Sequence, residues 1–263
     1  MIDAVVAAAE AAGRVIQEVR GSDIHVESKG DAGPVTLADR EADSLLKARL
    51  LELAKVGWLS EETADDPKRL NKSRLWIVDP LDGTKEFVAG LPEYCVAVAL
   101  VEAAQPVIGV VHNPATGDTF WAERGRGAFC NGRKIRVAEG RKLLASRSEL
   151  KRGEFEPFQA NWDVTATGSI QYKLALIAAG EAAVTFSRGP KHEWDVCAGA
   201  LIVVEAGGLA TDLFGGKLTY NQPFPKVKGV LAGAPGAYAR AGAQVEATGA
   251  SDRMAEFSDL PSA

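Results

Sequence analysis

Hydrophobic residues recur at helical spacing in two segments near the start of the chain. Between residues 2 and 20, apolar side chains repeat every three or four positions, and Gly21 follows as a helix stop. A set of spaced leucines predicts a second helix from residue 36 to about residue 55. We therefore expect the chain to begin with two helices.

Short apolar runs follow these helices and change the pattern from helix to strand. Residues 58–60 and 75–78 are apolar runs that end at acidic residues, as buried strands do when they deliver side chains to a common edge. From residue 94 to about residue 137, short β-prone runs alternate with breakers such as Pro106 and Asn131 followed by Gly132. This alternation predicts an antiparallel meander.

Strand and helix patterns alternate in the remainder of the chain. Strands are expected at residues 143–146, 164–167, 182–187 and 230–232, and helices at residues 170–179 and 196–206. The fold class is therefore α/β, with an α+β half at 1–140 and an α/β half at 141–244. Residues 245–263 are rich in Ala, Gly, Ser and Asp, which predicts a loosely ordered tail.

Composition narrows the classes of function. The chain has 263 residues and a net charge of −5, so a role in binding nucleic-acid backbones is not expected. No segment is apolar enough to span a bilayer, and the N-terminus lacks the basic start of a signal peptide, so no membrane partner is expected. Three widely spaced cysteines form neither a disulfide framework nor a zinc pattern, as in a reduced cytoplasmic protein.

Three acidic clusters stand where predicted elements end. They are Glu61 with Glu62, residues 79–84, and Asp195 after Trp194. Each has an ordinary alternative: a solvated strand end, an Asp-Pro and Asp-Gly turn, or a helix N-cap. Three such coincidences after apolar residues favour a functional site, because sites are built at the ends of regular elements.

The cluster at residues 79–84 has the chemistry of a metal site. Asp79 closes an apolar strand, and Asp82 lies three residues further on, in a turn where it can face the same point. The Leu81 carbonyl lies between them, Gly83 permits close approach of the backbone, and Thr84 supplies a hydroxyl. Hard oxygen ligands suit Mg²⁺, and two such ions can activate water and stabilise a leaving oxygen.

Several segments resemble the inositol monophosphatase superfamily. Residues 59–63 (LSEET), 76–84 (WIVDPLDGT) and 194–199 (WDVCAG) are similar to its signature motifs, and residues 109–114, 127–132 and 205–208 are similar to its other shared segments. The resemblance runs from about residue 2 to about residue 235. It implies a layered α/β/α/β/α fold, a Mg²⁺-dependent phosphatase activity on a small soluble phosphate ester, and inhibition by Li⁺. A homodimer is a further expectation from the family.

The resemblance also implies a role for each matching residue. Two or three Mg²⁺ ions would be held by Glu61, Asp79, the Leu81 carbonyl, Asp82 and Asp195. Thr84, partnered by Asp39, would orient and help to deprotonate the attacking water, and Glu62 would support the ligands or a third ion. The implied reaction is direct attack of water on phosphorus without a phospho-enzyme. No cysteine or histidine lies in a motif typical of a covalent nucleophile.

Three features are similar to the bacterial 3'(2'),5'-bisphosphate nucleotidase (CysQ) group and imply hydrolysis of 3'-phosphoadenosine 5'-phosphate to AMP and phosphate. They are residues 84–87 (TKEF), the segment 168–173 (GSIQYK), and Arg188 where inositol monophosphatases carry a Glu. The implied substrate contacts are Gly83, Thr84, Gly168, Ser169, Lys173 and Arg188. Lys85, Lys173 and Arg188 could instead be surface charges. Alternative functions are an inositol-1-monophosphatase, a broad sugar phosphatase, or a catalytically silent regulatory protein on the same fold.

Overall fold

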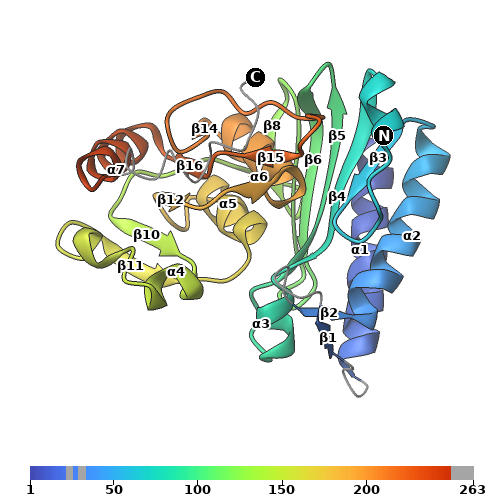
Figure 1. The fold of residues 1–263 in the computed structure, drawn as a ribbon, viewed down its shortest axis with the longest axis horizontal. Coiled ribbons are helices and arrows are strands. Elements are labelled where there is room, and N and C mark those ends of the chain that lie inside the picture. The colour runs from blue at the N-terminus through green and yellow to red at the C-terminus, as the bar shows by residue number, and fades with distance from the viewer. Residues whose placement is uncertain (22–25, 29–33, 250–263) are drawn as a thin grey trace.

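A computed structural model of the chain describes residues 1–21, 26–28 and 34–249 and stacks them as alternating layers of helix and sheet (Figure 1). Helices α1 (Ile2–Arg20) and α2 (Leu37–Leu53) form one outer layer against a seven-stranded sheet. Helices α5 (Ile170–Ala178) and α6 (Glu193–Glu205) separate that sheet from a five-stranded sheet. Helix α7 (Pro235–Ala247) covers the far face of the second sheet. The predicted layered α/β/α/β/α fold is confirmed.

The first sheet is the meander that the sequence predicts, with one parallel strand added at its edge. Its order follows the chain: β3 (Gly57–Ser60), β4 (Arg74–Asp82), β5 (Cys95–Glu102), β6 (Gln105–Asn113), β7 (Asp118–Glu123), β8 (Gly127–Cys130) and β9 (Arg133–Ile135). β3 runs parallel to β4, and all later neighbours are antiparallel. β4 extends to Asp82, whereas the apolar run predicts a strand that stops at residue 78.

The second sheet is mixed. Its order is β11 (Asp163–Ala166), β10 (Lys142–Ala145), β12 (Val184–Ser187), β16 (Val230–Gly233) and β14 (Leu209–Thr211). β10 pairs in parallel with β11 and β12, and β16 pairs antiparallel with β12 and β14. Parallel neighbours bring their carboxyl ends to one edge, which is where α/β sheets place ligands.

Short elements join these layers. They are the pairs β1 (Val26–Ser28) with β2 (Pro34–Thr36) and β13 (Lys191–His192) with β15 (Lys226–Val227), the helices α3 (Thr84–Val88) and α4 (Arg147–Lys151), and the 3₁₀ turns η2 (Pro67–Asn71) and η3 (Glu156–Phe158). Helix α6 begins at Glu193, three residues before the predicted start. Helix α7 continues to Ala247 although a loose tail was expected from residue 245, and residues 250–263 lie outside the described part.

Helix α6 is apolar on nearly every face because sheet residues surround it. Its buried side chains join the inner faces of both sheets into one hydrophobic cluster. The helix approaches β6 so closely that a Cβ on Gly109 would lie 2.7 Å from the Ala198 carbonyl oxygen. Glycine therefore permits this backbone-to-backbone contact, which fixes the height of α6 above the first sheet.

The helices of residues 1–21, 26–28 and 34–249 include none with the length and apolar character that crossing a bilayer requires. The seven-stranded sheet ends at Ile135 and the five-stranded sheet begins with β10 at Lys142. The division of the chain into halves near residue 140 stays a prediction, because residues on both sides share one core cluster.

Gly109→Ala is predicted to destabilise the fold, because the added methyl group meets the rigid backbone of α6. Overpacking of this kind costs about 1–3 kcal/mol, which corresponds to a fall in Tm of roughly 2–4 °C per kcal/mol for a chain of this size. Gly189→Ala is the matched control, since nothing lies within 4 Å of its added Cβ. Thermal denaturation of the two variants checks this, and equal Tm values would contradict the close packing of α6.

Candidate active site

An open pocket of about 620 Å³ lies where β3 and β4 end and where α5 and α6 begin. All five predicted metal ligands line it, although they come from three separate segments: Glu61, Asp79, Leu81, Asp82 and Asp195. The predicted substrate residues Gly83, Thr84, Gly168, Ser169 and Lys173 line the same pocket. The structure therefore brings together residues that lie up to 134 positions apart (61 to 195).

A β-bulge aims the two aspartates of β4 into this pocket. Asp79 pairs with Ala97 and Asp82 pairs with Cys95, so β4 uses three steps where β5 uses two. Without the extra residue, side chains three apart in a strand would face opposite sides of the sheet. Because of the bulge, Leu81 packs into the core beneath α1 and α2 while both carboxylates face the pocket.

Gly83 makes the sharp change from strand to helix that follows. Its φ of +97° lies in the left-handed region, which strongly favours glycine. A Cβ there would lie 2.7 Å from the Glu93 carbonyl oxygen and 3.1 Å from the Tyr94 Cα. Glycine therefore lets α3 start directly after Asp82 and places Thr84 at the pocket wall.

Thr84 and Asp39 are in direct contact, as the resemblance predicted. The Thr84 hydroxyl lies 3.0 Å from Asp39 Oδ1 and 3.1 Å from the Leu81 carbonyl oxygen, and can donate its proton to either. Asp39 is 2 % exposed, and its Oδ2 accepts hydrogen bonds from the backbone N–H and the hydroxyl of Thr36. The capping box that starts α2 therefore also fixes the carboxylate that orients Thr84.

Asp82 is held from the opposite side by the start of α5. Its Oδ2 accepts hydrogen bonds of 2.6 Å from both the Ser169 hydroxyl and the Gln171 backbone N–H. Ser169 is the N-cap of α5 and has a φ of +53°, which is uncommon for a residue with a side chain. The strained cap therefore directs its hydroxyl at Asp82 and anchors one carboxylate oxygen.

An ion-pair cluster supports this cap from outside. Glu93 accepts a 2.6 Å hydrogen bond from the Gly168 backbone N–H and forms a two-pronged ion pair with Arg147. Arg147 also lies 3.5 Å from Glu86 and sits on the wall of the pocket. Arg147 begins α4, which follows β10 of the five-stranded sheet, and Glu93 precedes β5 of the seven-stranded sheet, so this cluster connects the two sheets beside the site.

The carboxylates of the pocket lie close together and are largely shielded from water, and both conditions raise their pKa values. Burial raises the pKa of Asp79 well above its ordinary range, and repulsion from Glu61, Asp82 and Asp195 raises it further. Burial, followed by repulsion from Asp82, raises the pKa of Asp195 to about 7. Burial also raises the pKa of Asp82, although the bonds from Ser169 and Gln171 oppose this. The pocket therefore concentrates negative charge that a cation would stabilise.

The carboxylate and carbonyl oxygens of the pocket are the ligand type that a hard divalent cation prefers. Within the described residues, no group of three carboxylate, imidazole or thiol side chains is arranged to hold a single ion. Asp195 Oδ2 accepts the His192 backbone N–H at 2.8 Å, within the capping box of α6. The helix-capping alternative thus describes part of the role of Asp195, whose carboxylate also lines the pocket.

Three predicted residues lie apart from the pocket lining: Asp39, which contacts Thr84 from behind the wall, Arg188 and Glu62. Arg188 donates a 2.6 Å hydrogen bond to the Thr248 hydroxyl, and its guanidinium lies over the Phe158 ring. Ser187 lines the pocket, and Arg188, the next residue, faces the other side of the second sheet. Arg188 therefore lies away from the pocket in which its contact with a substrate was expected. Glu62 also lies outside the lining, where its backbone N–H approaches the Ser60 hydroxyl.

The pocket contains a buried polar group that the sequence reasoning missed. Glu149 is 3 % exposed and accepts 2.5 Å hydrogen bonds from the hydroxyls of Ser146 and Ser187. Lys173 is 2 % exposed and lies close enough for Glu149 to raise its pKa, although burial has the larger effect and lowers it. The Ser-x-x-Glu pattern at residues 146–149 was a usable signal, since it is the sequence signature of a capping box and predicts the start of α4, where Ser146 accepts the Glu149 N–H.

The chain matches the Inositol monophosphatase family over residues 1–249. It is 36% identical to the inositol-1-monophosphatase of Rhizobium meliloti over 231 residues, which are 82% of this chain and 85% of the relative. Extragenic suppressor protein suhB from Bartonella henselae superposes with a TM-score of 0.82 at 32% identity, covering 93% of this chain and 97% of that one. CysQ from Bacteroides thetaiotaomicron superposes with a TM-score of 0.74 at 29% identity, covering 89% and 96%.

Asp195→Asn is predicted to stabilise the metal-free protein more at pH 8 than at pH 5. The folded protein holds the Asp195 proton up to a pKa of about 7, above the ordinary value of 3.8, so stability from this group is lost progressively as the pH rises from the lower value through the higher one. The amide cannot ionise and avoids this loss. Thermal denaturation in excess chelator at both pH values measures the effect, with Asp163→Asn on the exposed edge of β11 as the control. A Tm gain that is equal at both pH values would contradict the assigned repulsion.

Proposed function

Because this chain belongs to the inositol monophosphatase family, whose members are Mg²⁺-dependent phosphoric monoester hydrolases, we propose that its pocket hydrolyses a small soluble phosphate monoester. The observation that carries the proposal is the meeting of carboxylates from three segments beside the Thr84–Asp39 pair in one pocket. Glu61, Asp79, Asp82, Asp195 and the Leu81 carbonyl would hold the metal, and the donors are oxygen atoms throughout, as Mg²⁺ prefers. We propose two or three ions, since the pocket offers more carboxylates than one Mg²⁺ needs.

Mg²⁺ supplies Lewis acidity when bound: it makes water a stronger acid and offsets the charge of the phosphate oxygens. The protein must orient the water and accept its proton. Asp39 Oδ1 accepts the Thr84 proton, so the Thr84 oxygen is left with lone pairs directed into the pocket. A water that donates to this oxygen is aligned by a group that is itself fixed by Thr36. Proton transfer would pass from water to Thr84 and from Thr84 to Asp39.

We further propose that the preferred ester carries a second anionic group, as 3'-phosphoadenosine 5'-phosphate does. Lys173 supports this view: it is buried and lines the pocket, and its ammonium group has no hydrogen bond or ion pair among residues 1–21, 26–28 and 34–249. A second phosphate could give this cation a charge-assisted partner. Lys191 lines the same pocket and adds positive charge. Arg188 has no part in the proposal because it faces the opposite side of β12.

Inositol-1-phosphate is the second candidate substrate. The observation in its favour is the 36% identity with the Rhizobium meliloti inositol-1-monophosphatase over most of both chains. Inositol hydroxyls need neutral or acidic partners, which Ser146, Ser148 and Glu149 could provide at the pocket wall. Glu149 already accepts hydrogen bonds from the hydroxyls of Ser146 and Ser187. A substrate hydroxyl would therefore have to compete with one of them for the Glu149 carboxylate.

Asp82→Asn is predicted to reduce phosphate release by on the order of 10²-fold or more, because it removes the negative charge of one metal-binding carboxylate while preserving the shape of the side chain. A chelator should abolish the activity of the unchanged chain, and added Mg²⁺ should restore it. Asp163→Asn, remote from the pocket, is the control and should retain full turnover. Phosphate release from a panel of monoesters measures both effects. Full activity in excess chelator, or normal turnover by Asp82→Asn, would overturn the proposed metal site.

Lys173→Met is predicted to lower kcat/KM for 3'-phosphoadenosine 5'-phosphate by about 10–100-fold, the usual value of one charge-assisted hydrogen bond. The unchanged chain should prefer this substrate over inositol 1-phosphate, for which Lys173→Met should have little effect. Lys142→Met, at an exposed position on β10, is the matched control. Steady-state kinetics with both substrates makes the comparison. Equal efficiency of the unchanged chain on both esters would favour an inositol monophosphatase with broad specificity.

A further inference from the structure

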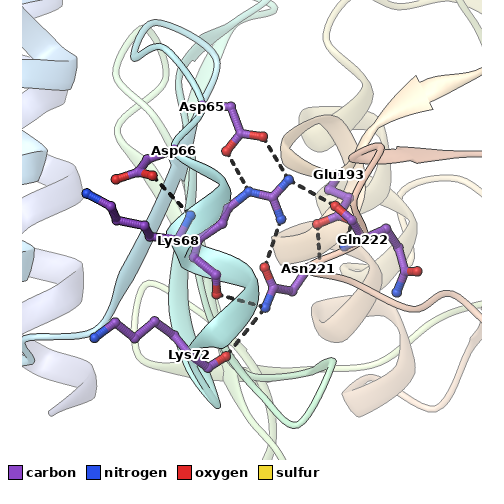
Figure 2. Close-up of polar contacts among 8 residues, drawn as sticks. Asp65, Asp66, Lys68, Lys72, Glu193, Asn221 and Gln222 are labelled. Carbon is purple, nitrogen blue, oxygen red and sulfur yellow. Dashed lines mark hydrogen bonds and ion pairs between the residues drawn. The ribbon is translucent and has the colours of Figure 1, made fainter.

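Arg69 forms a buried polar bridge between the two halves of the chain, some distance in sequence from every motif. The residue lies in η2 and is 3 % exposed. Its guanidinium donates two parallel hydrogen bonds to Asp65, of 2.6 and 2.9 Å, from Nε and Nη2. The remaining contacts cross to the second half, as Figure 2 shows: Nη1 donates to Asn221 Oδ1 at 2.8 Å, and Nη2 donates to the Gln222 carbonyl at 2.9 Å.

Asn221 and Gln222, which accept the hydrogen bonds of Arg69, are themselves held by further hydrogen bonds. Asn221 has a φ of +64°, and its side-chain amide donates back to the carbonyls of Arg69 and Lys72. The backbone N–H groups of Asn221 and Gln222 both donate to the Glu193 carboxylate, at 2.7 and 2.8 Å (Figure 2). Glu193 is fully buried and is the first residue of α6. A continuous set of hydrogen bonds therefore runs from Asp65 through Arg69 and Asn221 to Glu193.

The two ends of this bridge are attached to elements that carry two of the pocket carboxylates. At one end, η2 packs against β3, since the Arg69 Cβ lies 3.5 Å from the place of an added Cβ on Gly57, and Glu61 directly follows β3, with its backbone N–H bonded to the Val78 carbonyl. At the other end, Glu193 lies two residues before Asp195 in the same helix. Glu61 and Asp195 come from different halves of the chain, so their separation depends on how firmly η2 is attached to the start of α6.

We propose that Arg69 is a positioning residue for the metal site, which sets the separation of Glu61 and Asp195 through Asn221 and Glu193. The inference rests on the proposed function, because it assigns Arg69 a role in metal affinity. Arginine suits this role since its planar fork binds Asp65 with two bonds and still reaches the Asn221 side chain and the Gln222 carbonyl. A lysine could carry the charge but not this geometry. The carboxylates repel one another, so a looser bridge lets them separate and weakens the site.

Asn221→Gly is the most informative variant, because glycine keeps the positive φ and the backbone N–H to Glu193 while removing the amide that binds Arg69. Arg69→Gln and Arg69→Lys remove the fork from the other side. For all three we expect the Mg²⁺ concentration for half-maximal activity to rise about 10-fold, at the lower end of the effects seen for residues that support metal ligands. We expect kcat to recover at saturating Mg²⁺, and the rise in Tm produced by a fixed, subsaturating Mg²⁺ concentration to shrink.

Ile16→Ala is the control for loss of stability alone. Ile16 is fully buried in the cluster between α1 and the first sheet, on the face away from the pocket. This variant should lower Tm but leave the half-maximal Mg²⁺ concentration unchanged. If the Arg69 and Asn221 variants also lower Tm without changing their Mg²⁺ dependence, the bridge is only structural and the proposal is overturned.

The unchanged chain separates this inference from the proposed function. If it hydrolyses phosphate esters with Mg²⁺ and the variants keep its metal affinity, only the role of Arg69 is wrong. If it gains Tm with Mg²⁺ but releases no phosphate, the Tm measurements still decide the role of Arg69 and the proposed activity is wrong. If Mg²⁺ has no effect on either quantity, both proposals are overturned.

Discussion

The repulsion between carboxylates held in one partly buried pocket is the constraint on which the rest of this structure depends. Asp79 is almost completely buried, and its neighbours Glu61, Asp82 and Asp195 all raise its pKa. Each ionised carboxylate destabilises the others, and the hydrogen bonds and lysines beside Asp82 offset only part of the effect of burial. The carboxylates must therefore be held in place by hydrogen bonds and packing in the strands and helices from which they project.

Those connections are largely the first turns of helices. Asp39 and Asp195 each complete a capping box, at the starts of α2 and α6, and Ser169 is the N-cap of α5. Thr84 is the first residue of α3. Helix N-termini carry unpaired N–H groups and a partial positive charge, which makes them suitable supports for negative groups. The same hydrogen bonds that begin these helices therefore also hold the acidic and hydroxyl groups in place, and the ion pair of Arg147 with Glu93 strengthens the arrangement.

The sequence predicted most of the fold and the membership of the pocket, but not the directions of all side chains. Apolar periodicity predicted α1 and α2, because each buries one face, and short apolar runs between breakers predicted the meander, whose central strands are buried on both faces. The start of α6 was placed too late because Glu193 is acidic yet fully buried, and only its distant partners at residues 221 and 222 explain this. Arg188 was misplaced because its direction depends on the register of β12. Arg69 had no recognisable signal, as Asn221 lies 152 positions away.

The bulge in β4 has a consequence for how this chain can change. At their spacing of three positions, Asp79 and Asp82 share the pocket only because one extra residue on β4 is accommodated against β5. Without Pro80 or Leu81 the two aspartates would stand two positions apart, which is the spacing at which a regular strand already places side chains on one face. The extra residue is therefore not what a pair of carboxylates alone would require. It bends the main chain so that the Leu81 carbonyl oxygen lies within reach of the Thr84 hydroxyl at the pocket wall. This oxygen belongs to the backbone, so no substitution of a side chain can remove it, whereas a change in the length of the segment can.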